Sequence, residues 1–188
     1  MLAVMTQFLL DVFLHGFAGA LLLRFLLQWL RAPLRNPIGE FVMALTDFLV
    51  LRARRLIPSV WRLDSATLLL AICVELIYLS LTVWVQGYPV AGFPLPGLLA
   101  WSAVALVKLS VYFLMAALVV QAILSWVNPH TPITPLLSAI TGRFLRPVQR
   151  ILPLIGNVDL SPLVLLVICQ IILFAPLAML ENMAKQSL

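Results

Sequence analysis

Four apolar stretches, each long enough to cross a membrane as a helix, divide the sequence of 188 residues. A helix needs about 20 mostly apolar residues to cross the hydrocarbon core of a bilayer. Stretches of this kind, bounded by charged residues or proline, lie at residues 8–30, 66–86, 98–127 and 163–180. Because the bilayer core has no water to satisfy free backbone groups, each stretch is expected to be helical. The sequence therefore predicts an all-α membrane protein with four transmembrane helices.

The composition supports a membrane protein and argues against a soluble one. Hydrophobic residues make up 63% of the chain and charged residues 10%, and the mean hydropathy is +1.11. A soluble domain usually has about 25% charged residues. The net charge of +5 does not indicate a nucleic-acid partner, because the basic residues lie beside apolar spans and not on a polar domain with stacking aromatics.

Basic residues are unevenly distributed among the connections between the spans. Nine of the twelve lysines and arginines fall in the first and third connections: Arg31, Arg35, Arg52, Arg54, Arg55 and Arg62, then Arg143, Arg146 and Arg150. The second connection, residues 87–97, is uncharged and rich in Pro and Gly. Arg-rich connections stay in the cytoplasm. The Arg-rich connections are therefore predicted to be cytoplasmic, and both termini are predicted to face the periplasm or the cell exterior.

The two Arg-rich connections also contain sequences typical of amphipathic helices. In the second of them, apolar residues recur at helical spacing over residues 133–152, and the three arginines gather on another face. The other connection repeats this pattern less regularly over residues 38–57. A helix of this kind lies in the membrane interface, where its basic side chains meet anionic headgroups. Each connection is therefore predicted to hold a cytoplasmic interfacial helix.

The sequence repeats itself at a spacing of about 95 residues. A shift of 95 superposes Pro37 on Pro132, Ile38 on Ile133, Thr46 on Thr141, Arg55 on Arg150, Pro58 on Pro153 and Asp64 on Asp159. A shift of 97 superposes Trp29 on Trp126 and places Arg24 opposite Gln121. Such self-similarity predicts two copies of one unit, residues 1–92 and 93–188, each consisting of a span, an interfacial helix and a second span. Because each unit crosses the membrane twice, the copies are expected to be parallel repeats.

Seven short segments, spread over both copies, carry a resemblance to a known family. They are Leu22–Trp29, Asn36–Ile38, Arg54–Pro58 and Leu63–Ala66, then Ala122–Trp126, Leu145–Pro153 and Gly156–Pro162. Together they resemble the YggT family over almost the whole chain. The resemblance implies a bacterial inner-membrane protein linked to osmotic or ion stress and to cell-division gene neighbourhoods, with chloroplast relatives linked to membrane biogenesis in thylakoids and to nucleoid distribution. It implies no catalytic residue.

Two opposite charges are expected near mid-depth of neighbouring spans. Given the rise per residue of an α-helix, Glu75 lies roughly 16 Å along its span from Asp64, and Lys108 lies about 15 Å along its span from Leu98. Ionisable side chains at this depth are costly and are usually paired or functional. We expect a salt bridge between Glu75 and Lys108. An ion- or proton-handling site and separate roles in a cavity are the alternatives.

Three further ionisable residues lie in the first span. Arg24 is about two turns from the predicted inner interface, so its guanidinium is expected to snorkel to the headgroups, with a buried site as the alternative. Asp11 and His15 are four residues apart and share one face of a helix. We expect a hydrogen-bonded pair at the interface. A proton relay or a cation site is the alternative for these two residues.

Asp64 and Asp159 each precede the second span of their copy. Asp-Ser and Asp-Leu-Ser-Pro are typical of helix starts, where a side-chain oxygen caps free amides and proline occupies the first turn. Capping is the expected role, and catalysis or metal binding is the alternative. Either aspartate is also placed to pair with the upstream arginines, which would pin the interfacial helix to the span.

The sequence favours a non-catalytic function. It contains no nucleophile with its base, no phosphate-binding Gly loop and no metal-ligand set, so no enzyme activity, metal or cofactor is expected. We predict a protein that organises or assists assembly of membrane complexes, as a homo-oligomer or in a larger complex. A small ion or osmolyte channel or transporter component is the alternative. Six arginines are the candidates for binding anionic lipid headgroups or protein partners: Arg52, Arg54, Arg55, Arg143, Arg146 and Arg150.

Overall fold

Helices make up every secondary-structure element of the part of the chain that the computed structural model describes, which is residues 1–55, 64–87, 95–128, 131–151 and 160–186. Four helical segments are long and apolar enough to cross a membrane: Leu2–Trp29, Ser65–Val85, Leu95–Ser125 and Ser161–Gln186. The predicted all-α fold with four candidate membrane spans is confirmed.

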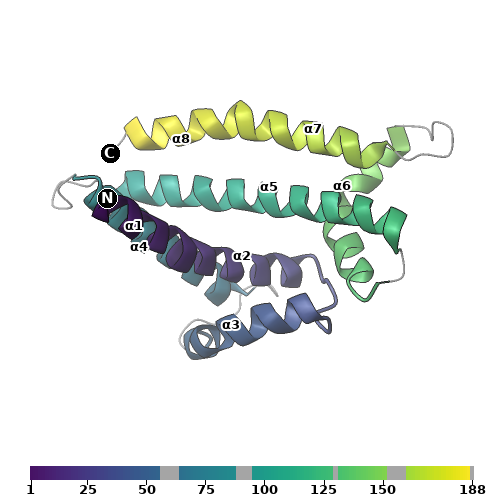
Figure 1. Cartoon of the computed structure of the whole chain (residues 1–188), viewed down its shortest axis with the longest axis horizontal. Coiled ribbons are helices and arrows are strands. Elements are labelled where there is room, and N and C mark those ends of the chain that lie inside the picture. Colours follow the sequence, from purple (N-terminus) through teal and green to yellow (C-terminus); the bar gives the residue numbers. More distant parts are fainter. Residues whose placement is uncertain (56–63, 88–94, 129–130, 152–159, 187–188) are drawn as a thin grey trace.

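The spans and the shorter helices alternate along the chain. The first span consists of α1 (Leu2–Leu10), the π-helical η1 (Asp11–His15) and α2 (Gly16–Trp29), followed by α3 (Pro37–Ala53) and the second span α4 (Ser65–Val85). The second copy consists of α5 (Leu95–Val127), α6 (Thr134–Ile151) and the last span, α7 (Ser161–Phe174) with α8 (Pro176–Gln186). Both termini lie at one end of the molecule, and α6 lies at the other (Figure 1).

The first and last spans are longer than predicted. The first begins at Leu2 and not at Phe8, because the helix continues through the apolar residues before Phe8. The last span runs on to Gln186, past the predicted end at residue 180. Proline cannot donate the backbone hydrogen bond that would continue α7, so α7 ends at Phe174 and Pro176 starts α8. The charged residues after 180 therefore belong to the same span.

The helices in the two Arg-rich connections begin and end close to the predicted bounds. Asn36 caps α3 by accepting a hydrogen bond from the Gly39 backbone N–H at 2.9 Å, and Pro37 occupies the first helical position. Both helices bury a few side chains against the spans and expose their arginines: α3 buries Val42, Thr46 and Val50, and α6 buries Leu136, Leu137 and Leu145. Residues 56–57 and 152 of the predicted helices lie outside the described residues.

Three clusters of buried apolar side chains hold the bundle together. The first joins α2, α3, α4 and α5, with Leu21 and Val50 fully buried. The second joins α5, α6 and α7 around Leu118. A third, smaller cluster packs Leu136 of α6 against Leu27 at the end of α2. In Figure 1, α5 lies between the last span and the pair formed by α2 and α4, so α5 and α6 join the two copies.

Candidate functional site

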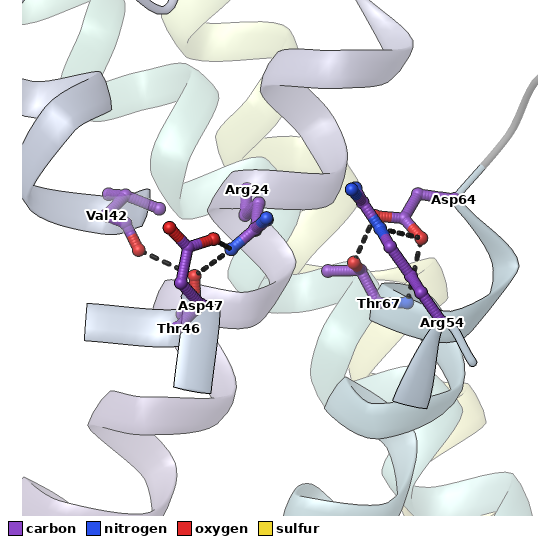
Figure 2. Close-up of polar contacts among 7 residues, drawn as sticks. All are labelled: Arg24, Val42, Thr46, Asp47, Arg54, Asp64 and Thr67. Atoms are coloured by element: carbon purple, nitrogen blue, oxygen red, sulfur yellow. Dashed lines mark hydrogen bonds and ion pairs between the residues drawn. The ribbon is translucent and has the colours of Figure 1, made fainter. Parts of the chain in front are cut away.

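A first polar cluster joins the first span to α3 around Arg24. Arg24 is only 3% exposed, and its Nη1 donates to Thr46 Oγ1 and to Asp47 Oδ1, each at 2.7 Å. Figure 2 shows all three side chains meeting between the two helices. The expectation that Arg24 snorkels to the headgroups is wrong, because α3 packs against α2 and provides a counter-charge inside the protein.

A second polar cluster, around Asp64, joins the end of α3 to α4 (Figure 2), and Gln28 connects it to α2. Asp64 caps α4 by accepting from the Thr67 backbone N–H at 3.4 Å, and its Oδ2 accepts from Arg54 Nη2 at 2.5 Å. The Gln28 amide, in the orientation that satisfies both neighbours, donates to Asp64 at 3.1 Å and accepts from Arg54 at 3.3 Å. Asp64 therefore caps its span and ties it to the end of α3. Asp159, the equivalent residue, lies outside the described residues.

The Asp64 cluster makes the stability of the first copy depend on pH. Burial raises the pKa of the Asp64 carboxyl, but hydrogen bonds from Arg54 and Thr67 outweigh burial and hold that pKa below its usual range. A carboxyl with a lowered pKa stabilises the fold above the pKa of the unfolded chain, about 3.9 for aspartate. This stabilisation is lost as the pH falls from there through the pKa of the folded state.

We expect the Asp64→Asn variant to lose this part of the pH dependence. The free energy of unfolding of the wild type should fall as the pH is lowered below about 4. The variant should be less stable at neutral pH, and its free energy of unfolding should fall less steeply with pH. Thermal unfolding in detergent between neutral pH and pH 2.5 or so measures both curves. Parallel curves would show that Asp64 does not contribute.

The two copies make an equivalent contact between the span and the helix that packs on it. In the first copy Thr46 Oγ1 accepts from Arg24. In the second copy Thr141 Oγ1 donates to Gln121 Oε1 at 2.5 Å. The shifts of 95 and 97 residues pair these same positions, so the repeat in the sequence corresponds to a repeated contact in the structure.

The charged groups around this contact differ between the copies. A shift of 95 residues places Gly142 at the position of Asp47 and Gln149 at the position of Arg54. The second copy therefore lacks counterparts of Arg24, Asp47 and Arg54 in these two ion pairs and retains an aspartate, Asp159, at the position of Asp64. Among the described residues, the first copy ties its short helix to the spans with ion pairs, whereas the second copy has the neutral contact between Thr141 and Gln121.

A third polar group lies inside the membrane spans, where Glu75 contacts the first span. Glu75 is fully buried in α4, and its Oε2 and Oε1 lie 3.0 and 3.2 Å from His15 Nδ1. The expected salt bridge between Glu75 and Lys108 does not form. Glu75 faces η1 of the first span and Lys108 faces α8, so each residue has a partner from a different helix.

Asp11 and His15 do not form the expected pair with each other. Asp11 Oδ1 accepts from the Tyr78 hydroxyl at 2.7 Å and from Gln7 Nε2 at 2.9 Å. Both residues lie in the π-helical turn η1, in which residues four apart are not stacked as in an α-helix. Each therefore reaches a separate partner on α4, Tyr78 or Glu75.

Lys108 pairs with a residue that sequence reasoning missed. Its Nζ donates to Glu181 Oε2 at 2.5 Å, and Lys185 Nζ donates to Glu181 Oε1 at 2.6 Å. Lys185 also lies over the ring of Trp101, 4.9 Å from its centroid. Glu181 lies beyond the predicted end of the last span at residue 180 but inside the helix that the structure shows. The spacing of four between Glu181 and Lys185 was the signal that the helix continues.

The arginines of α6 differ from those near α3. Arg143, Arg146 and Arg150 are all exposed, α6 contains no acidic residue, and no ion pair of these three is found among the described residues. Arg143 stacks on Trp29, with its guanidinium carbon 5.1 Å from the ring centroid. Near α3, Arg52 and Arg55 are exposed, but Arg54 is tied to Asp64. The face of α6 thus carries the unneutralised positive charge.

A cavity of about 980 Å³ lies between the two copies. Residues of α2, α4, α5, α6 and α7 line it, and nearly all of them are aliphatic or aromatic. Arg143 is the charged residue among the described lining residues. This lining suits an apolar ligand with a negatively charged group. No group of three or more His, Cys, Asp or Glu side chains in the described part of the chain is arranged to hold a metal ion.

These features define a class of protein: a polytopic α-helical membrane protein made of two tandem units, each with a short helix packed against two spans. The chain belongs to the CCB3/YggT family, whose model matches residues 3–85 and 100–180. The two matched segments correspond to the two copies. No solved structure matches the chain.

Relatives in several bacteria are similar over most of their length. The uncharacterized protein PA0392 of Pseudomonas aeruginosa is 38% identical over 144 residues, which is 76% of this chain and 73% of the relative. The uncharacterized protein YggT of Escherichia coli K12 is 33% identical over 168 residues, covering 88% of this chain and 85% of the relative. A Vibrio alginolyticus protein encoded in the proC 3' region is 34% identical, with 86% and 87% covered.

Proposed function

We propose that this protein is a non-catalytic component of the bacterial inner membrane that organises membrane complexes or assists their assembly through its basic interfacial helices. The observation that carries the proposal is the face of α6. Its apolar side chains pack on the spans, while Arg143, Arg146 and Arg150 stay exposed and form no ion pair within the described residues. Such a face attracts anionic headgroups or acidic protein surfaces.

The contribution of α3 is expected to be smaller. Arg24 and Arg54 of the first copy are neutralised by Asp47 and Asp64, so they stabilise the fold and are not free to bind a partner. Arg52 and Arg55 remain exposed at the end of α3. The two basic regions therefore have different roles in this proposal: α3 mainly holds the first copy together, and α6 mainly binds.

Transport is less well supported than organisation. The ionisable groups inside the spans have partners, since Glu75 contacts His15 and Lys108 contacts Glu181. The cavity between the copies is lined mainly by hydrocarbon side chains and not by the polar groups that an ion path requires. By the positive-inside rule, α3 and α6 face the cytoplasm in this proposal.

The proposal is tested by neutralising α6 in the full chain. The triple variant Arg143→Gln, Arg146→Gln, Arg150→Gln is produced in bacterial membranes and extracted in mild detergent, and the mass of its native complex is compared with that of the wild type. We expect the wild type to occur in a complex that the variant no longer forms. The matched control removes three exposed arginines before and in α3: Arg31→Gln, Arg35→Gln and Arg52→Gln.

Two results would contradict the proposal. One is an unchanged complex in the α6 triple variant. The other is specific flux of an ion or osmolyte through proteoliposomes of the wild type, which would replace the organising role by the transport alternative. The control triple variant should keep the complex, because its loss would mean that total charge matters and not the face of α6.

A further inference from the structure

We propose that the cavity between the two copies is a binding site for one anionic phospholipid, whose acyl chain fills the cavity and whose phosphate binds Arg143. The inference rests on the proposed function in one respect, namely that α6 lies at anionic lipid headgroups. It adds a defined binding site between the two copies that holds one lipid molecule.

The cavity has the length of one leaflet of a bilayer. Its wall on α5 extends from Ala103 to Leu114, which is about 16 Å at 1.5 Å per residue. The hydrocarbon core of a bilayer is about 30 Å thick. The cavity begins at α6, which lies at one end of the bundle (Figure 1), and at the ends of α2 and α7 next to it, where Leu30 and Leu165 line it. It therefore reaches from that membrane face towards the middle of the bilayer. This is the depth that an acyl chain of the same leaflet occupies.

The cavity is open to lipid along its side. Its inner wall contains the buried residues Leu106 and Leu165. Other lining residues lie on the protein surface: Val107, Phe144 and Ile172 are 49%, 38% and 38% exposed. In a membrane this apolar edge faces acyl chains, so a lipid can enter from the side. The volume is at the upper end of the range of about 300–1,000 Å³ for small-molecule sites.

A single positive charge stands at the α6 end of this apolar wall. Arg143 is held there by stacking on Trp29, which leaves the guanidinium N–H groups available for a phosphate. Tryptophan itself is common at the depth of the headgroups. The shift of 95 residues pairs Arg143 with Phe48, so the repeated fold does not require a charge at this position. The charge therefore indicates a ligand.

An anionic phospholipid matches these features better than the other occupants. A neutral apolar ligand would leave Arg143 without a counter-charge. A zwitterionic headgroup brings a cation of its own, which weakens its attraction to arginine. A second polypeptide would have to supply an acidic residue next to Trp29 as well as an apolar helix one leaflet long. A phospholipid supplies both groups in one molecule.

The test is native mass spectrometry of the full chain, incubated in mild detergent with equal amounts of phosphatidylglycerol and phosphatidylcholine of the same chain length. Two variants change the site: Arg143→Gln removes the charge, and Ala103→Phe fills the cavity. Two matched controls lie outside the lining: Arg35→Gln removes an exposed arginine before α3, and Ala100→Phe adds the same ring elsewhere on α5. A further variant, Arg150→Gln, tests whether lipid binds diffusely along α6. Elution as a single symmetrical species and an unchanged helical circular dichroism spectrum verify that each variant is folded.

We expect the wild type to retain one phosphatidylglycerol molecule in preference to phosphatidylcholine. Arg143→Gln should lower that preference by about fivefold, as expected for one arginine near an anionic headgroup. Ala103→Phe should reduce retention of both lipids. Arg35→Gln and Ala100→Phe should behave as the wild type.

Three outcomes would overturn the inference. A loss in Arg150→Gln equal to that in Arg143→Gln, with none in Ala103→Phe, would mean that lipid binds diffusely along α6, and the proposed function would stand without this site. If the wild type shows no preference for phosphatidylglycerol, neither this site nor the binding of anionic lipid by α6 in the proposed function is supported. A second copy of the chain bound in place of lipid, and lost in Ala103→Phe, would identify the cavity as a dimer contact.

Discussion

Replacing His15 by alanine is expected to lower the free energy of unfolding by about 3 kcal/mol, because it leaves a buried carboxylate without its partner. Glu75 is fully buried and contacts only His15 among the described ionisable groups within salt-bridge distance. In the membrane, a carboxylate that loses its partner must either stay charged in a poor solvent or take up a proton. Both cost free energy that the pair avoids.

The opposite substitution is expected to be much milder. Glu75→Gln removes the buried carboxylate, and a neutral imidazole left at the bundle surface costs less in an apolar environment than an unpaired buried charge. We expect a loss of about 1 kcal/mol, which is typical of a weakened hydrogen bond. The double variant His15→Ala, Glu75→Gln should recover most of the loss seen for His15→Ala, because the buried charge is gone.

Equilibrium unfolding in mixed micelles, with increasing sodium dodecyl sulfate, measures this cycle of variants. The signature is the asymmetry between removing histidine and removing glutamate. Similar losses for both single variants would show that the pair contributes only by packing. A loss in the double variant equal to the sum of the two single losses would show that the residues do not interact.

The features that could be predicted from the sequence are those that depend on long segments. Each span follows from about 20 consecutive apolar residues, a signal that tertiary contacts hardly alter. The sequence repeat also corresponds to a repeat in the structure, since Thr46 and Thr141 make equivalent contacts. The outer ends of the first and last spans are not predictable in this way, because the polar residues Thr6 and Gln7 and the charged Glu181 suggest boundaries but lie inside helices.

The partners of single ionisable residues could not be predicted in the same way. Helical spacing gives the depth of Glu75 and Lys108 but not the direction in which each faces, and a rotation of one helix by a third of a turn changes the partner. Arg24 was expected to reach the headgroups because nothing in the span itself could neutralise it. The carboxylate of Asp47 comes from α3, whose packing against α2 is set by apolar contacts along both helices.

Replacing Asp47 by leucine is expected to destabilise the packing of α3 on α2 by about 3 kcal/mol, because it leaves the Arg24 guanidinium buried and uncompensated. Arg24 would keep its hydrogen bond to Thr46, but a neutral hydroxyl does not balance the charge. Hydrogen exchange should show the loss as faster exchange of the α3 amides. The amides of α6 should be unaffected, because Thr141 contacts the neutral Gln121.

The second copy provides the design of the rescue. Arg24→Gln introduces the residue that the second copy has at this position. The Asp47 carboxylate left without its partner can still be hydrated, because its side chain is 39% exposed. We therefore expect Arg24→Gln alone to cost about 1 kcal/mol, and Arg24→Gln combined with Asp47→Leu to restore protection of α3. If the double variant exchanges as fast as Asp47→Leu alone, the buried charge is not the cause. If protection returns, the first copy depends on its ion pair only because it carries Arg24, and the neutral contact of the second copy is sufficient to hold such a helix on its span.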